Sequence, residues 1–89
     1  FFFFFHFLHG VSPDEQELAF VAIEGTMDAM TRNIYTIPAS GGQEKRLTNI
    51  LQPNDGPEYS PDGNWIYFNS ELKSPNAQIF RIKRDGSGI

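Results

Sequence analysis

The sequence predicts an all-β protein made of β-propeller blades, each blade a four-stranded antiparallel repeat. Two copies of one repeat follow each other, and short strands alternate with turn signals inside each copy. The second strand of the first copy is apolar on both faces, as in strands covered by a sheet on either side. Aromatic residues make up 15% of the chain and suit such half-buried strands. These observations favour sheets stacked on sheets, as neighbouring blades are in a propeller.

The repeat is visible as two pairs of aligned segments. Residues 11–20 align with residues 59–68 at an offset of 48 positions, and residues 33–37 align with residues 78–82 at an offset of 45. The three-residue difference falls in the loop between the aligned segments, where insertions are tolerated.

The first eight residues differ from the rest because seven of them are Phe or Leu. They lack the basic start and small-residue cleavage site of a signal peptide and are far shorter than the roughly twenty residues that span a bilayer. We set residues 1–8 aside as an artefactual or uncertain apolar segment, in preference to a functional tail. The first propeller repeat then spans residues 9–48, and the second spans residues 49–89 with its fourth strand missing.

The first repeat predicts four strands. One ends near Val11, and the others cover residues 17–23, 33–38 and 44–48, with a Gly-Gly turn before the last. The second repeat predicts the first three strands again and a turn over residues 85–88.

The Ser-Pro-Asp-Gly segment of the second repeat predicts a hairpin turn. The Ser60 hydroxyl can accept a backbone N–H, Pro61 presets φ, and Gly63 can adopt a positive φ at little cost. Glu15 takes the place of Gly63 in the first repeat, so that turn is expected to be strained by about 1 kcal/mol or to use another geometry.

The alternation of apolar residues places the strands inside a stack of sheets. The two faces of the second strand carry, respectively, Leu18, Phe20, Ala22 and Ala19, Val21, Ile23. Because each blade is covered only by its neighbours, two blades are expected to leave two bare faces that carry residues such as Phe20, Tyr35, Trp65 and Phe80. Self-association of the chain is one way to complete a propeller ring, and the preferred interpretation is that the chain is a fragment of a longer propeller.

The net charge of −4 and the pI near 4.9 argue against binding to nucleic acid. The Lys45-Arg46 and Lys83-Arg84 pairs are interpreted as solvated strand ends. The absence of cysteine excludes disulfides, thiolate nucleophiles and cysteine-ligated zinc, and it is compatible with a soluble protein of either the periplasm or the cytoplasm. No membrane insertion is expected.

His6 and His9 have the spacing of a metal pair on a helix, but they lie beside a strand without converging acids, so we predict no metal site. Ser12 and Ser60 lie outside any nucleophile elbow, and turn capping explains both.

The acidic residues and the glycine-rich segments also receive structural interpretations. Asp14 and Asp62 are equivalent turn positions of different repeats and are not expected to converge on one bond, with or without Glu58. Residues 86–88 follow a strand with no helix to bind phosphate, and residues 54–56 lack the acids of a calcium loop, so both segments are interpreted as turns.

The order of these motifs resembles a known repeat. Residues 60–70 (SPDGNWIYFNS) with 78–87 (QIFRIKRDGS), and residues 33–42 (NIYTIPASGG) with 46–48 (RLT), are similar to the repeat of TolB-like β-propellers. The resemblance covers about residues 9–89. It implies a six-bladed ring with about four strands per blade, usually without catalysis. We expect no cofactor.

Two functions are compatible with the sequence. The first is a non-catalytic scaffold that binds a protein or a small ligand through its loops and inner strands, for which the candidate residues are His9, Gly10, Pro57 and Glu58. The alternative is the propeller part of an enzyme, either the entrance domain of a prolyl-oligopeptidase-type serine peptidase or a polysaccharide-lyase-like propeller. The chain contains no evident catalytic set, so we predict no catalytic residue in it.

Overall fold

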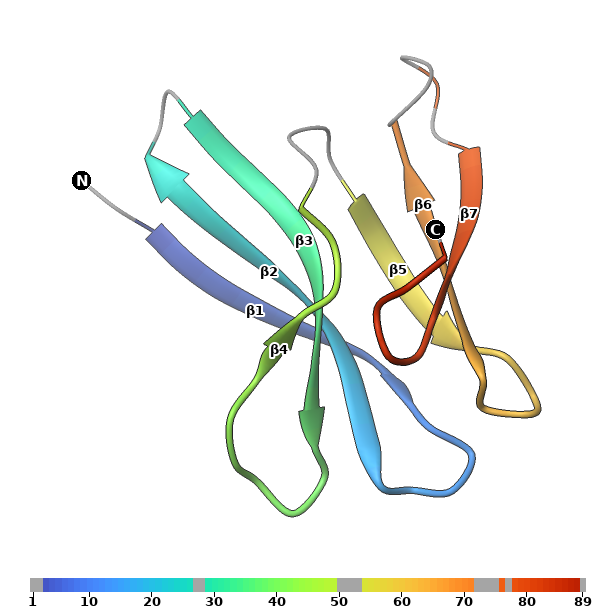
Figure 1. Cartoon of the computed structure of the whole chain (residues 1–89). Helices are drawn as coiled ribbons and strands as arrows, with labels where there is room; N and C mark the ends of the chain where they lie inside the picture. The colour runs from blue at the N-terminus through green and yellow to red at the C-terminus, as the bar shows by residue number, and fades with distance from the viewer. Residues whose placement is uncertain (1–2, 27–28, 50–53, 72–75, 77, 89) are drawn as a thin grey trace.

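The computed structural model describes residues 3–26, 29–49, 54–71, 76 and 78–88. The regular elements of this part of the chain are all β-strands: β1 (Phe3–Val11), β2 (Glu17–Thr26), β3 (Ala29–Pro38), β4 (Lys45–Arg46), β5 (Asn54–Tyr59), β6 (Trp65–Ser70) and β7 (Gln78–Lys83). They form a first sheet, in the order β1-β2-β3-β4, and a second sheet, in the order β5-β6-β7 (Figure 1). All pairings are antiparallel, so the prediction of an all-β, antiparallel protein is confirmed for these residues. The described residues contain no helix that could cross a membrane.

The hairpin of β2 and β3 is longer than the sequence predicted. These strands pair without interruption until Thr26 lies opposite Ala29, beyond the predicted strand end at Ile23. The apolar alternation stops at Ile23, whereas backbone pairing needs no apolar side chain and continues through Glu24 and Thr26. β4 is shorter than predicted, with two paired residues.

β1 pairs with β2 along its whole length, from Phe3 to Val11. Residues 3–8, which the sequence analysis set aside, are therefore part of this strand. In Figure 1 this strand forms one edge of the first sheet, with β2 as its single neighbour in the sheet and β3 on the far side of β2.

Each repeat has a bulge at the same point of its first strand. In β1 the register shifts by one residue at His9, and in β5 it shifts between Asp55 and Glu58. The offset of 48 aligns Pro57 with His9, so the two repeats share the position of this bulge as well as their sequence pattern.

The prediction of a turn at residues 54–56 is wrong, because these residues belong to β5. The Asn54 side chain is buried, and its Nδ2 donates to the carbonyl oxygen of Arg32 at 2.8 Å. Gly56 has a φ of 62° beside the bulge. The positive φ of Gly56 therefore belongs to a bulge within a strand and not to a loop.

The two sheets pack face to face around one core. Its buried side chains come from β2, β3, β6 and β7 and from the residue after β4: Val21, Ile34, Leu47, Ile66, Phe68 and Ile82. Burial of a side chain of this size contributes about 1.5–3 kcal/mol, so this core stabilises the packing of the two sheets, in which β5 is the strand of the second sheet that lies against the first. A smaller cluster of Phe20, Ala22 and Tyr35 lies on the other face of the first sheet.

The second sheet is covered on one face only. Along β6, the side chains of Ile66, Phe68 and Ser70 are buried, whereas Tyr67 is 39% exposed. On β7, Ile79 is 74% exposed. The outer face of the second sheet, as we call the side that carries Tyr67 and Ile79, has no covering layer among the described residues.

The residues predicted on bare faces are placed differently. Phe20 and Tyr35 are 6% and 7% exposed, Phe80 packs against the main core, and Trp65 is half-buried. This part of the prediction is wrong, because Phe20 and Tyr35 stack on each other with ring centroids 5.6 Å apart and form a core of their own.

Candidate binding cleft between the two sheets

The two Ser-Pro-Asp turns are held by the same hydrogen bonds. In the second repeat, the Ser60 hydroxyl accepts the N–H of Trp65 at 3.1 Å and donates to Asp62 Oδ1 at 2.5 Å, and the same Oδ1 accepts the N–H of Asn64 at 3.0 Å. The corresponding distances in the first repeat are 3.0, 2.6 and 3.0 Å. The predicted turns, including the role of the Ser60 hydroxyl, are confirmed.

The first repeat keeps this geometry despite its glutamate. Glu15 has a φ of 61° and Gly63 a φ of 78°. Of the two alternatives left by the sequence, strain or another geometry, the structure has the strained one. Glu15 is the one non-glycine residue with positive φ among those described.

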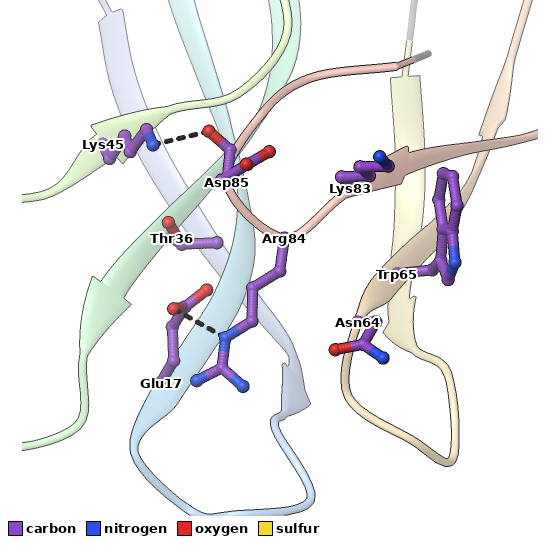
Figure 2. A pocket seen from close by; sticks show the side chains of 8 residues that line it. All are labelled: Glu17, Thr36, Lys45, Asn64, Trp65, Lys83, Arg84 and Asp85. Atoms are coloured by element: carbon purple, nitrogen blue, oxygen red, sulfur yellow. Dashed lines mark hydrogen bonds and ion pairs between the residues drawn. The ribbon is translucent and has the colours of Figure 1, made fainter.

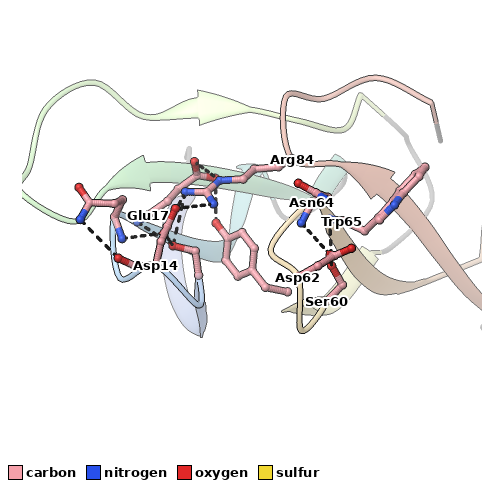
Figure 3. A network of polar contacts seen from close by, with 10 residues as sticks. Asp14, Glu17, Ser60, Asp62, Asn64, Trp65 and Arg84 are labelled. Atoms are coloured by element: carbon pink, nitrogen blue, oxygen red, sulfur yellow. Dashed lines mark hydrogen bonds and ion pairs between the residues drawn. The ribbon is translucent and has the colours of Figure 1, made fainter.

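Arg84 joins the second sheet to the turn of the first (Figure 3). Its Nε donates to Glu17 Oε2 at 3.0 Å, and its Nη1 donates to Asp14 Oδ2 at 3.0 Å. The Tyr59 hydroxyl donates to Glu17 Oε1 at 2.8 Å, and the Arg84 guanidinium lies 5.6 Å from the Tyr59 ring centroid. A side chain that begins at the end of β7 thus binds two carboxylates at the beginning of the chain.

These contacts change the acidity of the groups involved. The Arg84 guanidinium, followed by the Ser12 hydroxyl, holds the pKa of Asp14 well below its usual range. The hydrogen bond to Asp14 raises the pKa of Arg84. Burial, followed by the hydrogen bond to Glu17, raises the pKa of Tyr59 far above its usual value. Asp14 and Arg84 therefore keep their charges, and Tyr59 keeps its proton, over the physiological pH range.

The same end of the molecule contains an open cleft of about 650 Å³ between the two sheets. The lining residues come from the ends of β2, β3, β6 and β7, from β4 and from the adjoining turns: Glu17, Thr36, Lys45, Asn64, Trp65, Lys83, Arg84 and Asp85. Figure 2 shows Arg84 reaching across it from the end of β7 to Glu17. The volume lies in the range of small-molecule sites.

The two lysines of the cleft differ from Arg84 in forming no direct ion pair among the described residues, although both lie near enough to the Asp85 carboxylate to help lower its pKa. Lys45 Nζ donates to the backbone carbonyl of Asp85 at 2.6 Å. Lys83 Nζ lies 5.8 Å from the ring centroid of Trp65, whose ring also has Arg81 Cζ at 3.8 Å. The Asp85 carboxylate instead accepts the hydroxyl and the N–H of Ser87, which lower its pKa.

The residues predicted as a binding site lie away from this cleft. Gly10 is buried, and a Cβ added to it would lie 3.2 Å from the carbonyl oxygen of Pro57, which is itself buried. Glu58 is exposed and lies opposite Tyr67 in the second sheet. His9 is the bulge residue of β1, and its side chain lies outside the described residues. The structure thus brings Gly10 and Pro57 together as a contact between sheets, and their role in binding stays a prediction.

The other candidate residues lie in turns. Ser12 and Ser60 hold the turns described above, and Asp14 and Asp62 each bind within their own turn. No group of three potential metal ligands occurs among the residues that the structure describes.

Sequence reasoning missed the cleft residues. Lys83 and Arg84 were interpreted as a solvated strand end, yet the Arg84 side chain is 25% exposed and bridges the sheets. One signal was available: Glu17 and Trp65 occupy equivalent positions of a closely matched repeat but differ in chemistry. Such a difference indicates that the two turns have different neighbours.

The chain is similar to two proteins from Agrobacterium. It is 42% identical over 81 residues to an uncharacterized protein of Agrobacterium fabrum strain C58, an alignment that covers 91% of this chain and 26% of that protein. A solved structure from Agrobacterium tumefaciens, provisionally assigned as TolB, matches with a TM-score of 0.77 and 42% identity over 93% of this chain and 28% of that one. No protein-family profile matches. The chain spans less than a third of the length of these relatives, and it has a TolB-like, all-β fold.

Proposed function

We propose that this chain forms two blades of a β-propeller that acts as a non-catalytic scaffold and binds an acidic protein segment or small ligand in the cleft between the sheets. The observation that carries the proposal is the cleft itself, in which Lys45 and Lys83 form no direct ion pair among the described residues. A cation without a direct ion pair at an open site favours a ligand with a carboxylate or phosphate group.

The surroundings of the lysines support this class of ligand. Three of the seven Lys and Arg residues of an acidic chain line the cleft. Arg84 is neutralised by Asp14 and Glu17, whereas the two lysines share the nearby Asp85 carboxylate without a direct ion pair, so one positive charge is left for a ligand. Trp65 adds an indole surface, and Asn64 an amide, that can contact the uncharged part of the ligand.

The propeller arrangement is supported by the faces that the sheets use. The first sheet packs through Val21 and Ile34, whereas the second packs through Phe68 and Ile82. The alignment offsets place Val21 on Asn69 and Ile34 on Ile79, which lie on the outer face of the second sheet. The contact therefore joins opposite faces of the repeat, as successive blades do, and it can be continued by further repeats.

The binding proposal can be tested by NMR on the ¹⁵N-labelled chain, with citrate, inorganic phosphate and acetyl-Asp-Phe-amide as probes. The indole N–H of Trp65, the chain's one tryptophan, reports on the cleft directly. We expect shifts concentrated at Asn64, Trp65, Lys83 and Asp85. Absence of shifts at these residues with every probe at about 10 mM, a concentration that detects millimolar binding, would contradict the proposal.

A charge-matched pair of variants sharpens this test. Lys83→Ala removes a cation of the cleft, and Arg32→Ala removes an exposed cation of β3 that does not line it. We expect Lys83→Ala to weaken probe binding about fivefold or more and Arg32→Ala to change it less than twofold. Equal effects would mean that net charge, rather than the cleft, attracts the probes.

A further inference from the structure

The turn after β7 carries a carboxylate whose direction is fixed by its own hydrogen bonds. Asp85 Oδ1 accepts the hydroxyl of Ser87 at 2.7 Å and the N–H of the same residue at 3.0 Å. These two bonds, with the hydroxyl as the first cause, hold the pKa of Asp85 below its usual value. The second oxygen, Oδ2, accepts no hydrogen bond from the described residues. Asp85 is exposed and lines the cleft, so it presents an ionised carboxylate with one oxygen left for a ligand.

Both lysines of the cleft pack against this same turn. Lys45 Nζ donates to the carbonyl oxygen of Asp85 at 2.6 Å, and Lys45 Cε lies 3.9 Å from the position of a Cβ added to Gly86. Lys83 Cε lies 3.8 Å from the position of a Cβ added to Gly88. Figure 2 shows Asp85 between Lys45 and Lys83, and both lysines help to lower its pKa. The turn therefore gathers two cations around one carboxylate.

The other two charged side chains that line the cleft neutralise each other. Arg84 Nε lies 3.0 Å from Glu17 Oε2, and the same guanidinium also pairs with Asp14 outside the cleft. What remains for a ligand is the group of Lys45, Lys83 and Asp85. A ligand complementary to this group has two anionic groups and one cationic group. A ligand with anionic groups alone would bring one of them towards Asp85, which weakens its binding.

We propose that the cleft binds an amino dicarboxylate, such as glutamate, with its carboxylates on Lys45 and Lys83 and its ammonium group on Asp85 Oδ2. Asp85 then selects an amino dicarboxylate over a simple dicarboxylate, and Ser87 is the positioning residue that orients Asp85. This inference rests on the proposed function, because it names the ligand class of the same cleft.

The ligand class is tested by NMR titration of the ¹⁵N-labelled chain with L-glutamate and with glutarate. The two molecules have the same carbon chain and the same two carboxylates, and they differ only in the ammonium group. We expect glutamate to bind at least about threefold more tightly, although glutarate has the larger net negative charge. Binding of glutarate as tight as that of glutamate, or tighter, would overturn the proposal.

Asp85→Asn should have opposite effects on the two ligands. Glutarate should bind about threefold more tightly, because a repelling charge is removed, and glutamate about threefold more weakly, because its ammonium group loses a carboxylate. The matched control is Asp62→Asn, which removes an exposed carboxylate of another turn that does not line the cleft. We expect this control to change the binding of both ligands less than about 1.5-fold. A gain in the binding of both ligands to the Asp85→Asn protein would mean that Asp85 acts through net charge alone, and would overturn its contact with the ammonium group.

The positioning role of Ser87 has its own pair of variants. Ser87→Ala removes the 2.7 Å bond to Asp85, whereas Ser87→Thr keeps a hydroxyl at this position. We expect the preference for glutamate over glutarate to fall about twofold or more in the Ser87→Ala protein and to be retained in the Ser87→Thr protein. An unchanged preference in the Ser87→Ala protein would refute the positioning role.

The titrations separate this inference from the proposed function. Shifts at Trp65, Lys83 and Asp85 with citrate, phosphate or acetyl-Asp-Phe-amide, but no preference for glutamate over glutarate, would refute the ligand class and leave the cleft as an anion-binding site. Absence of shifts with every probe, glutamate included, would refute the cleft as a binding site and both proposals with it. Shifts at the cleft together with opposite effects of Asp85→Asn on the two ligands would support both.

Discussion

The two Ser-Pro-Asp turns have the same internal hydrogen bonds but different contacts with the rest of the molecule. Both use a serine hydroxyl and an aspartate oxygen for the same hydrogen bonds, and both place a residue at positive φ. The first turn has Glu15 at that position and holds Arg84 of the second sheet. The second has Gly63 there, and its aspartate has no ion pair among the described residues. Local hydrogen bonds therefore specify the turn, whereas its neighbours in space decide what it binds.

The glycine of the second turn is the more constrained of the two positions. Gly63 is buried, and a Cβ added to it would lie 3.4 Å from Pro13 Cδ and 3.6 Å from Arg84 Nη1. Glu15 is exposed. The two turns thus tolerate different residues at one repeat position, because the first turn packs against the second.

Gly63→Val is the substitution in these turns with the largest expected effect on the free energy of unfolding. A β-branched residue at a φ of 78° is strained, and its methyl groups would displace Pro13 or Arg84. We expect a loss of about 3 kcal/mol in the free energy of unfolding, measured by urea denaturation. A loss below about 1 kcal/mol would contradict the turn geometry, and Gly41→Val, in an exposed turn with open space, separates the strain from the crowding.

Arg84→Met should lower the free energy of unfolding somewhat less than Gly63→Val does. It removes the ion pairs with Asp14 and Glu17 but keeps much of the side-chain volume, and the Arg84 side chain is 25% exposed, which weakens the pairs by solvent screening. We expect a loss of about 2 kcal/mol in urea denaturation. Arg81→Met, which removes an exposed arginine that stacks on Trp65, should cost less than about 1 kcal/mol. Similar losses for both variants would show that Arg84 does not join the sheets in solution.

Glu15→Gly should make the first turn resemble the second and stabilise the protein. The glycine relieves the positive φ of Glu15 but adds freedom to the unfolded chain, so the net gain is expected to be small, about 0.5–1 kcal/mol. The shift of the urea midpoint measures it. A destabilised Glu15→Gly protein would mean that the Glu15 side chain contributes more than the strain costs.

The pH dependence of stability should distinguish the two aspartates. The pKa of Asp14 is lowered by Arg84 and by its turn, and that of Asp62 by Ser60 and the Asn64 N–H. A lowered pKa in the folded state contributes stability above the unfolded value of about 3.9, and this contribution is lost as the pH falls below that value. We expect Asp14→Asn to flatten the loss of stability between about pH 5 and 2 more than Asp62→Asn does, as followed by urea denaturation. The reverse order would contradict the assignment of Arg84 to Asp14.

The local parts of the fold could be predicted from the sequence. The turns at Ser60–Gly63 and at residues 85–88, the pairs of strands beside them and the two faces of β2 follow from residue types a few positions apart. The extension of β2 past Ile23 and the bulge at Gly56 could not be predicted, because backbone pairing continues without an apolar pattern and a bulge has the glycine signature of a turn. The candidate residues Gly10 and Pro57 were chosen by alignment, which shows equivalence within a repeat but not the contact between them.

The sequence by itself determined the β-strands, the repeat and the internal hydrogen bonds of each turn. The tertiary structure alone decided that Arg84 binds Asp14, that Gly63 faces Pro13 and that one face of the second sheet stays exposed. The reason is the distance along the chain: the turn bonds join residues two to five positions apart, whereas Arg84 and Asp14 are 70 positions apart. The hydrogen bonds within a turn can be predicted from the local residue types. The contact between Arg84 and Asp14 forms only once the two sheets have packed.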